Sequence, residues 1–168
     1  MLYEFLETPD AVMASCLECL RLAHAGGGRA GQNLRLALVD LVGLCDRQAR
    51  VGPVDPERLR RFRSEATDAM AHLDRQIAAF ILDVAMRVDH EARELDDWYE
   101  ICMRRSVLQL LLDDYPQTPA LAMVDATDMI GFDDHTRETG RAHGPIPEAL
   151  IPMGLPDTHW WWRYPRPG

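Results

Sequence analysis

The sequence predicts an all-α protein: a bundle of four or five helices with an extended, proline-rich, aromatic C-terminal tail packed across it. Apolar residues recur at three- and four-residue spacing through most of residues 1–131, which is typical of amphipathic helices. No pair of alternating segments flanks a hairpin turn, so strands are not expected. Prolines and glycines crowd residues 132–168. We therefore expect a helical bundle over 1–131 and an irregular tail over 132–168, both within one domain.

The first two predicted helices form a pair. Thr8 is suited to cap a helix that starts with Pro9 and continues to about Gly26. The segment GGGRAG then predicts a turn, and a second amphipathic helix is expected over residues 32–50. Because the connection is short, the two helices are expected to pack antiparallel.

A helix cap is predicted at Asp55, and apolar residues recur at three- and four-residue spacing after it. No glycine or proline interrupts the segment that follows Pro56, so the spacing predicts one long helix, or two nearly collinear helices, over residues 56–94. The apolar spacing is interrupted at DHEARE. A capping box from Asp97 to Glu100 then predicts the next helix over residues 98–114. Its VLQLLL segment is apolar enough to lie at the centre of the bundle.

A short fifth helix is predicted to begin at Pro119, after a cap at Thr118, and to stop at Gly131. The six prolines and four glycines of residues 132–168 leave room for only one helical turn, near residues 147–151. The remaining tail is expected to be irregular.

The tail ends in an aromatic run that includes Trp160, Trp161, Trp162, Arg163 and Tyr164. Three exposed indoles would form an apolar patch that monomers rarely carry, so some surface must cover them. An extended backbone would place Trp160, Trp162 and Tyr164 on one side. We expect the tail to clamp its own helices and to leave one indole partly exposed to a partner, because Trp, Tyr and Arg dominate interface hot spots. A membrane surface is disfavoured by the acidic remainder of the chain.

The charge of the chain bears on its partners. The formal net charge is −9, and all 18 basic residues are arginine, a usage typical of GC-rich bacterial genomes. Nucleic-acid binding is not expected, because it depends on neutralising phosphates. The longest apolar run, IAAFIL, is too short to insert across a bilayer. The first ten residues lack the pattern of a secretory signal, which predicts a cytoplasmic protein with reduced thiols.

One group of residues has the chemistry of a metal site. Asp68 and His72 lie four positions apart and would share a helical face, and His90 and Glu94 could complete a ligand set. Carboxylate-bridged metal bundles carry Glu-x-x-His pairs, and this chain has none. A solvated polar face is therefore the favoured interpretation of these four residues.

The cysteines and one arginine cluster have structural interpretations. Cys16 and Cys19 have the spacing of a redox or metal pair, but no strand precedes them, so core packing is favoured. Arginines from Arg58 to Arg63 crowd the start of a predicted helix, where positive charge opposes the helix dipole. We expect carboxylates of the same chain to pair with them, and the Asp-rich stretch over residues 125–135 is one source.

The sequence contains no nucleophile elbow and no phosphate-binding loop, so enzyme chemistry and a cofactor are not predicted. The leading hypothesis is a small acidic helical protein-binding module, an inhibitor, immunity protein or adaptor that occludes or holds another protein. The alternative is a helical-bundle metal-binding enzyme or sensor. A homodimer that pairs two copies of the long third helix is a further possibility.

Overall fold

The computed structural model describes residues 3–88 and 94–165. Its helices are α1 (Pro9–Ala25), α2 (Ala30–Arg50), α3 (Pro56–Ala71), α4 (Asp74–Val88), α5 (Leu95–Asp114), η1 (Pro119–Met123), α6 (Ala126–His143), η2 (Glu148–Leu150) and η3 (Trp160–Arg163), the η elements being 3-10 helices. No strand occurs in this part of the chain, which confirms the predicted all-α class. None of the helices so described is both long and apolar enough to cross a membrane.

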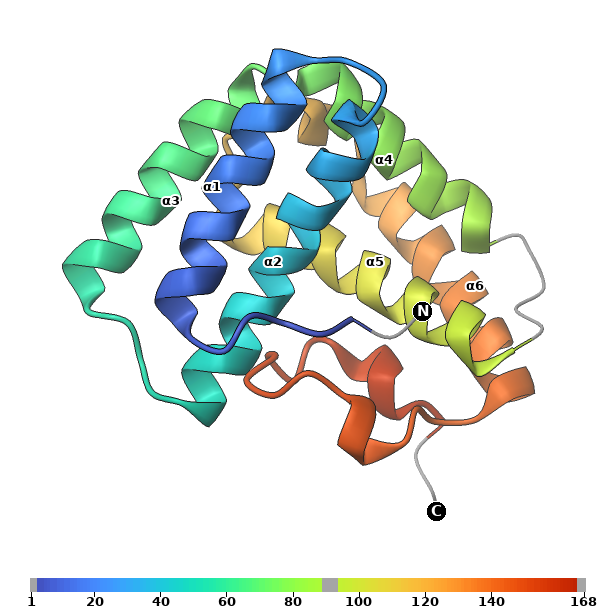
Figure 1. The fold of residues 1–168 in the computed structure, drawn as a ribbon. Helices are drawn as coiled ribbons and strands as arrows, with labels where there is room; N and C mark the ends of the chain where they lie inside the picture. Colours follow the sequence, from blue (N-terminus) through green and yellow to red (C-terminus); the bar gives the residue numbers. More distant parts are fainter. Residues whose placement is uncertain (1–2, 89–93, 166–168) are drawn as a thin grey trace.

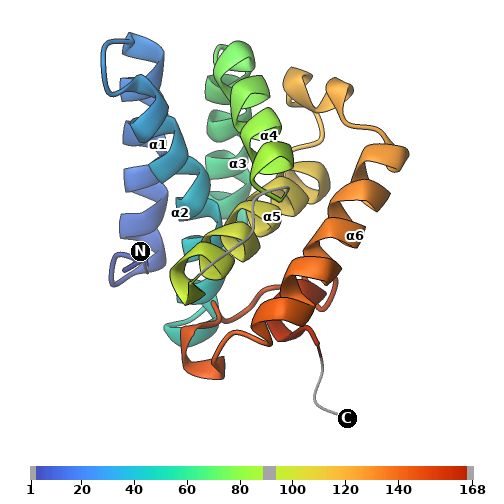
Figure 2. The same ribbon diagram turned by 90° about the vertical axis from the view of Figure 1, so that its right-hand side faces the viewer.

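The helices are arranged in three layers around α5. Figure 2 shows α1 and α2 on one side, α3, α4 and α5 in the middle, and α6 on the other side. The helices α1 and α2 pack antiparallel, as their short connection predicts, and α3 lies along α1 (Figure 1). Helix α5 is buried on nearly every side between Trp98 and Leu111. The buried residues between Trp98 and Leu111 lie on all faces of the helix and include Arg104, Arg105 and Ser106, so α5 occupies the centre of the bundle.

Local capping chemistry sets most helix starts. The Thr8 side chain accepts the N–H of the third helical residue of α1, and Asp55 caps α3 in the same way. Both caps confirm the predictions. Helix α5 begins three residues earlier than predicted: the Asp97 carboxylate accepts the N–H of Glu94 at 3.3 Å, so Asp97 acts from inside the first turn instead of preceding it.

The prediction of one long or nearly straight helix over residues 56–94 is wrong, because the chain turns at His72 and Leu73 (Figure 1). The N–H groups of these two residues bond to carbonyls three positions back, at 3.2 and 2.9 Å. Such a turn keeps residues three apart as neighbours, so Leu73 stays fully buried. The three- and four-residue spacing of apolar residues therefore continues through the bend. The homodimer hypothesis assumed one long third helix, and residues 56–88 form two shorter helices instead. Residues 89–93 lie outside the described part.

The predicted stop at Gly131 is also wrong. After the short η1, the long helix α6 begins beyond Asp125, whose side chain accepts the N–H of Asp128 at 2.8 Å. The helix passes through Gly131 and ends where Gly144 adopts a φ of +77°. A positive φ is a common way to end a helix and favours glycine, so the glycine that ends α6 is Gly144 and not Gly131. The irregular tail starts after His143, not at residue 132.

The tail crosses one end of the bundle beneath α2 and α5 (Figure 1). Gly154, with a φ of +72°, lies so close to α2 that a Cβ atom there would be 2.6 Å from the carbonyl oxygen of Cys45. The N–H of Met153 also donates to the Asp46 carboxylate of α2 at 2.8 Å. The tail is thereby fixed to the bundle by its backbone as well as by its aromatic side chains.

Two glycines inside α6 differ in their surroundings, which leads to a prediction. A Cβ atom on Gly131 would meet nothing within 4 Å, whereas one on Gly140 would lie 3.0 Å from the Tyr164 ring and 3.2 Å from the buried Trp98 ring. We predict that Gly131→Ala raises the free energy of unfolding by about 0.5–1 kcal/mol. Gly140→Ala should lower it, because Trp98 has no room to move. Urea unfolding measures both, and equal stability of the two variants would contradict this packing.

Candidate functional site

The aromatic run adopts a 3-10 helix, η3, instead of the extended backbone that the sequence predicts. Trp161 and Trp162 are both fully buried, while Trp160 is partly exposed. The alternation that an extended backbone would give, with Trp160 and Trp162 on one side, therefore does not occur. Of the predicted partner-binding residues, Trp161 and Trp162 are buried in the core. The expectation of an indole that stays partly exposed is confirmed, and this indole belongs to Trp160.

Ser106 of α5 is the hydrogen-bonding centre of the buried tail. Its Oγ lies 3.1 Å from Nε1 of Trp161, 2.8 Å from Nε1 of Trp162 and 3.0 Å from Nδ1 of His159. An indole N–H only donates, so the two indoles use both acceptor sites of the hydroxyl. The hydroxyl hydrogen can then be donated to Nδ1 of His159, in the tautomer that carries its ring hydrogen on Nε2. We call Ser106, His159, Trp161 and Trp162 the Ser106 node.

His159 is held neutral inside this node. Burial, together with the nearby positive charge of Arg105, lowers its pKa to about 4. With Nδ1 accepting from Ser106, the ring hydrogen lies on Nε2, a buried atom with no hydrogen-bond partner among the described residues. A serine and a histidine at this separation resemble a nucleophile and its base. Ser106 is 0% exposed, however, and its lone pairs face two indoles, so the pair is placed for stability and not for attack on a substrate.

Arg105 connects α6 to the same node. Its guanidinium lies 4.3 Å from the centre of the Trp161 ring and forms an ion pair with Asp133 of α6 at 2.9 Å. Burial lowers the pKa of Arg105, and the charge of Asp133 opposes that shift. A buried cation of this kind needs its partner, so the ion pair with Asp133 holds α6 against α5 beside the Trp161 indole.

The partly exposed side of η3 and the adjoining face of α6 form a surface that we call the aromatic edge: Trp160, Arg163 and Tyr164 with Arg137. The Trp160 ring lies 4.8 Å from the Arg137 guanidinium and meets the Tyr164 ring edge-on at 5.4 Å. Arg163 is exposed and forms an ion pair with Glu148 at 2.9 Å. The edge therefore places two arginines beside a Trp–Tyr pair.

The predicted metal ligands are not brought together in the described part of the chain. Asp68 and His72 are exposed near the end of α3, and Glu94 precedes α5, whose start lies away from the α3–α4 turn (Figures 1 and 2). His90 lies outside the described residues. Within residues 3–88 and 94–165, no three His, Cys, Asp or Glu side chains lie close enough to hold a metal ion.

The cysteines have the surroundings of core residues. Cys16 and Cys102 are buried, and the Cys16 thiol donates to the carbonyl of Ala37 at 3.3 Å. Burial raises the pKa of both thiols, and it raises that of Cys45 to about 11. High pKa values disfavour the reactive thiolate, so these contacts agree with the core-packing interpretation.

The arginines at the start of α3 find carboxylates within the chain, as predicted. Arg58 pairs with Asp10 of α1 at 2.8 Å, and Arg63 pairs with Asp114 of α5 at 3.1 Å. Neither partner belongs to the Asp-rich stretch that the sequence suggested as a source. These pairs join α3 to its neighbours.

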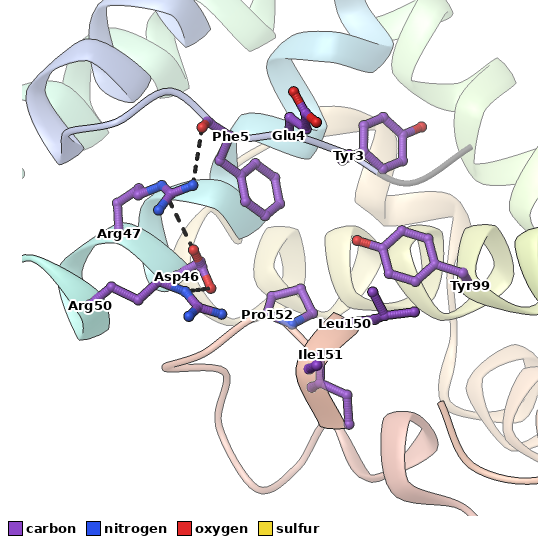
Figure 3. A pocket seen from close by; sticks show the side chains of 11 residues that line it. Tyr3, Glu4, Phe5, Asp46, Arg47, Arg50, Tyr99, Leu150, Ile151 and Pro152 are labelled. Carbon is purple, nitrogen blue, oxygen red and sulfur yellow. Dashed lines mark hydrogen bonds and ion pairs between the residues drawn. The ribbon is translucent and has the colours of Figure 1, made fainter. Parts of the chain in front are cut away.

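A pocket of about 460 Å³ opens between the N-terminal segment, α2, α5 and the tail (Figure 3). Asp46 lies at one end with the guanidinium groups of Arg47 and Arg50, and Phe5 and Pro152 form opposite walls. Sequence reasoning missed this pocket because its residues come from four separate segments. The Ser106 node was missed for the same reason, although Ser106 is the single serine of the central helix.

Comparisons of the chain with protein-family models, with curated proteins and with solved structures find no match. The two features that invite a functional interpretation are the aromatic edge and the pocket. Both are therefore judged on their own chemistry.

The Ser106 node leads to a prediction about stability. Ser106→Ala leaves the Trp162 N–H without an acceptor, whereas Trp161 keeps the carbonyl of Cys102 at 3.1 Å. We expect the free energy of unfolding to fall by about 2–3 kcal/mol, because a buried donor without a partner is costly. Ser64→Ala, at an exposed position of α3, is the matched control and should change it by less than about 0.5 kcal/mol. Similar effects of the two substitutions in urea unfolding would contradict the node.

His159 leads to a prediction about pH. Its pKa is about 4 in the folded protein against an ordinary value of 6.5, so the unfolded chain binds more protons between these values. Stability should therefore fall as the pH is lowered from 6.5 towards 4, by on the order of 3 kcal/mol from this residue. His159→Asn, whose amide oxygen can still accept from Ser106, should lack this part of the slope. Unfolding free energies measured across this pH range check it, and identical slopes in both proteins would refute it.

Proposed function

We propose that this chain is a small acidic protein-binding module that holds or occludes a partner protein through the aromatic edge. The observation that carries the proposal is the setting of Trp160. This indole is partly exposed, yet it is fixed by the Arg137 guanidinium on its face, by the Tyr164 ring, and by two buried tryptophans that follow it in the chain. An aromatic side chain held in this way loses little freedom on binding, which favours affinity.

The composition of the edge supports the same function. Tryptophan, tyrosine and arginine are the residues that contribute most to interface hot spots. Arg163 pairs with Glu148, and Arg137 pairs with Asp134 at 2.8 Å. Both pairs are exposed to solvent, so each is weak and can be exchanged for a carboxylate of the partner. The inhibitor, immunity-protein and adaptor roles all use such a surface.

The net charge of −9 indicates which partners would approach the module fastest. A protein with a net positive surface is attracted to an acidic body over a distance of about 10 Å at moderate salt. The edge then supplies short-range contacts that a merely electrostatic encounter lacks. We therefore propose a partner that is basic overall and carries a carboxylate next to an apolar patch at its contact surface.

The test compares two exposed arginines that each form an ion pair with a glutamate. Arg163 of the edge pairs with Glu148 at 2.9 Å, and Arg21 of α1, remote in sequence from the edge, pairs with Glu18 at 2.6 Å. In affinity capture from the organism that encodes the chain, we expect the wild type and Arg21→Glu to retain one stoichiometric partner. Arg163→Glu combined with Trp160→Ala should lose it while keeping a folded circular dichroism spectrum. Absence of any such partner, or its equal retention by all three proteins, would refute the proposal.

A further inference from the structure

We propose that the pocket between the N-terminal segment, α2 and the tail binds a small aromatic carboxylate. Figure 3 shows the guanidinium of Arg50 and the hydroxyl of Tyr99 directed into this pocket from opposite sides. Phe5 covers one face and Pro152 lies across from it. The pocket shares no lining residue with the aromatic edge, so this inference is independent of the proposed function.

The charged end of the pocket carries one uncompensated positive charge. Asp46 is 3% exposed and lies 2.8 Å from Nε of Arg50 and 3.8 Å from Nε of Arg47. One carboxylate thus faces two guanidinium groups. Glu4, the other acid among the lining residues, points away from the pocket interior (Figure 3). A ligand with a single negative charge would balance this end.

The hydrogen-bonding capacity of the two arginines is only partly used. Nε of Arg47 is buried and has no hydrogen-bond partner in the described part of the chain, and its Nη2 donates to the carbonyl of Phe5 at 3.1 Å. Arg50 uses Nε for Asp46, which leaves its terminal nitrogens available to a ligand. A guanidinium presents donors in a planar fork that matches the two oxygens of a carboxylate. The accessible terminal nitrogens of Arg50 therefore favour a carboxylate over a neutral ligand, whereas Nε of Arg47 is too buried for a ligand to reach.

The walls of the pocket favour a flat apolar body. The Phe5 ring lies directly against Gly43 of α2, in the space where a Cβ atom would stand, so close packing fixes the ring. Pro152 and Leu150 of the tail supply apolar surface across from it. An aromatic ring fits between two such faces and gains by stacking on Phe5. A pocket of about 460 Å³ lies within the range of small-molecule sites.

Tyr99 provides a polar group at the end opposite the arginines. Burial raises the pKa of its hydroxyl to about 12, so it is a neutral phenol at physiological pH. A neutral phenol both donates and accepts hydrogen bonds, so this end tolerates a polar substituent on the ligand without requiring a charge. The two ends of the pocket therefore differ: the arginines of α2 face the carboxylate of the ligand, and the neutral Tyr99 faces its other end.

The probe for this proposal is 2-naphthoate, and its neutral counterpart is 2-naphthamide. Isothermal titration of the full chain should show saturable binding of the carboxylate at millimolar concentration or below. The amide should bind at least about tenfold more weakly, because it lacks the charge that the arginines recognise. Equal affinity for the two probes, or no saturable binding of 2-naphthoate, would overturn the proposal.

Variants locate the binding. Arg50→Gln should weaken 2-naphthoate binding by at least about tenfold, whereas Arg60→Gln, which removes an exposed arginine paired with Glu57, should leave it unchanged. Because Arg50→Gln also removes an ion pair of the buried Asp46, Ala149→Trp is the second variant. It fills the mouth of the pocket from an exposed position and keeps every charge. Full affinity in either Arg50→Gln or Ala149→Trp would refute the site, whatever the outcome at the aromatic edge.

Discussion

A single hydroxyl group, that of Ser106, makes it possible for the tail to enter the core. Two indoles can be buried only if their N–H groups find acceptors, and the central helix offers this oxygen and the neighbouring carbonyl of Cys102. Each buried indole then contributes roughly 2–3 kcal/mol on area grounds. The position of η3, and through η3 that of Trp160, follows from this arrangement. Without the hydroxyl, apolar burial of the tail would be opposed by the cost of an unpaired donor.

The central helix combines this acceptor with a buried cation at the preceding position. Arg105 and Ser106 both contact Trp161, one through its face and the other through its N–H. Arg105 also reaches Asp133, so α5, α6 and the tail meet at one indole. Helix α6 itself buries little more than Thr136 and Gly140. Its attachment to the bundle thus depends on this ion pair and on close packing at Gly140 more than on a broad apolar face.

Local chemistry explains which elements could be predicted from the sequence. The caps at Thr8 and Asp55 use side chains within three residues of the groups they bind, so the sequence carries their full signal. The turn at Leu73 gives no signal, because a 3-10 turn and an α-helix share the i to i+3 spacing. Gly131 gave a misleading signal, because its backbone stays helical and the glycine that takes a positive φ and ends α6 is Gly144.

The candidate sites depend on longer distances along the chain. Ser106 and His159 are 53 residues apart, and the pocket joins residues 3–5 and 149–152 to α2 and α5. No local pattern reports such a meeting. The composition of the aromatic run did indicate that something must cover its indoles, which is a physical requirement independent of where the cover comes from. It could not show which indoles would be covered, because that depends on the 3-10 geometry of η3.

The tight winding of η3 has an evolutionary consequence. Within four consecutive residues, Trp161 and Trp162 face the core while Trp160 and Arg163 face outward. Selection for folding therefore acts more strongly on the inner two positions than on Arg163, where the side chain is exposed and a substitution costs little stability. A single helical turn thus contains both the positions on which the fold depends and one position that can vary.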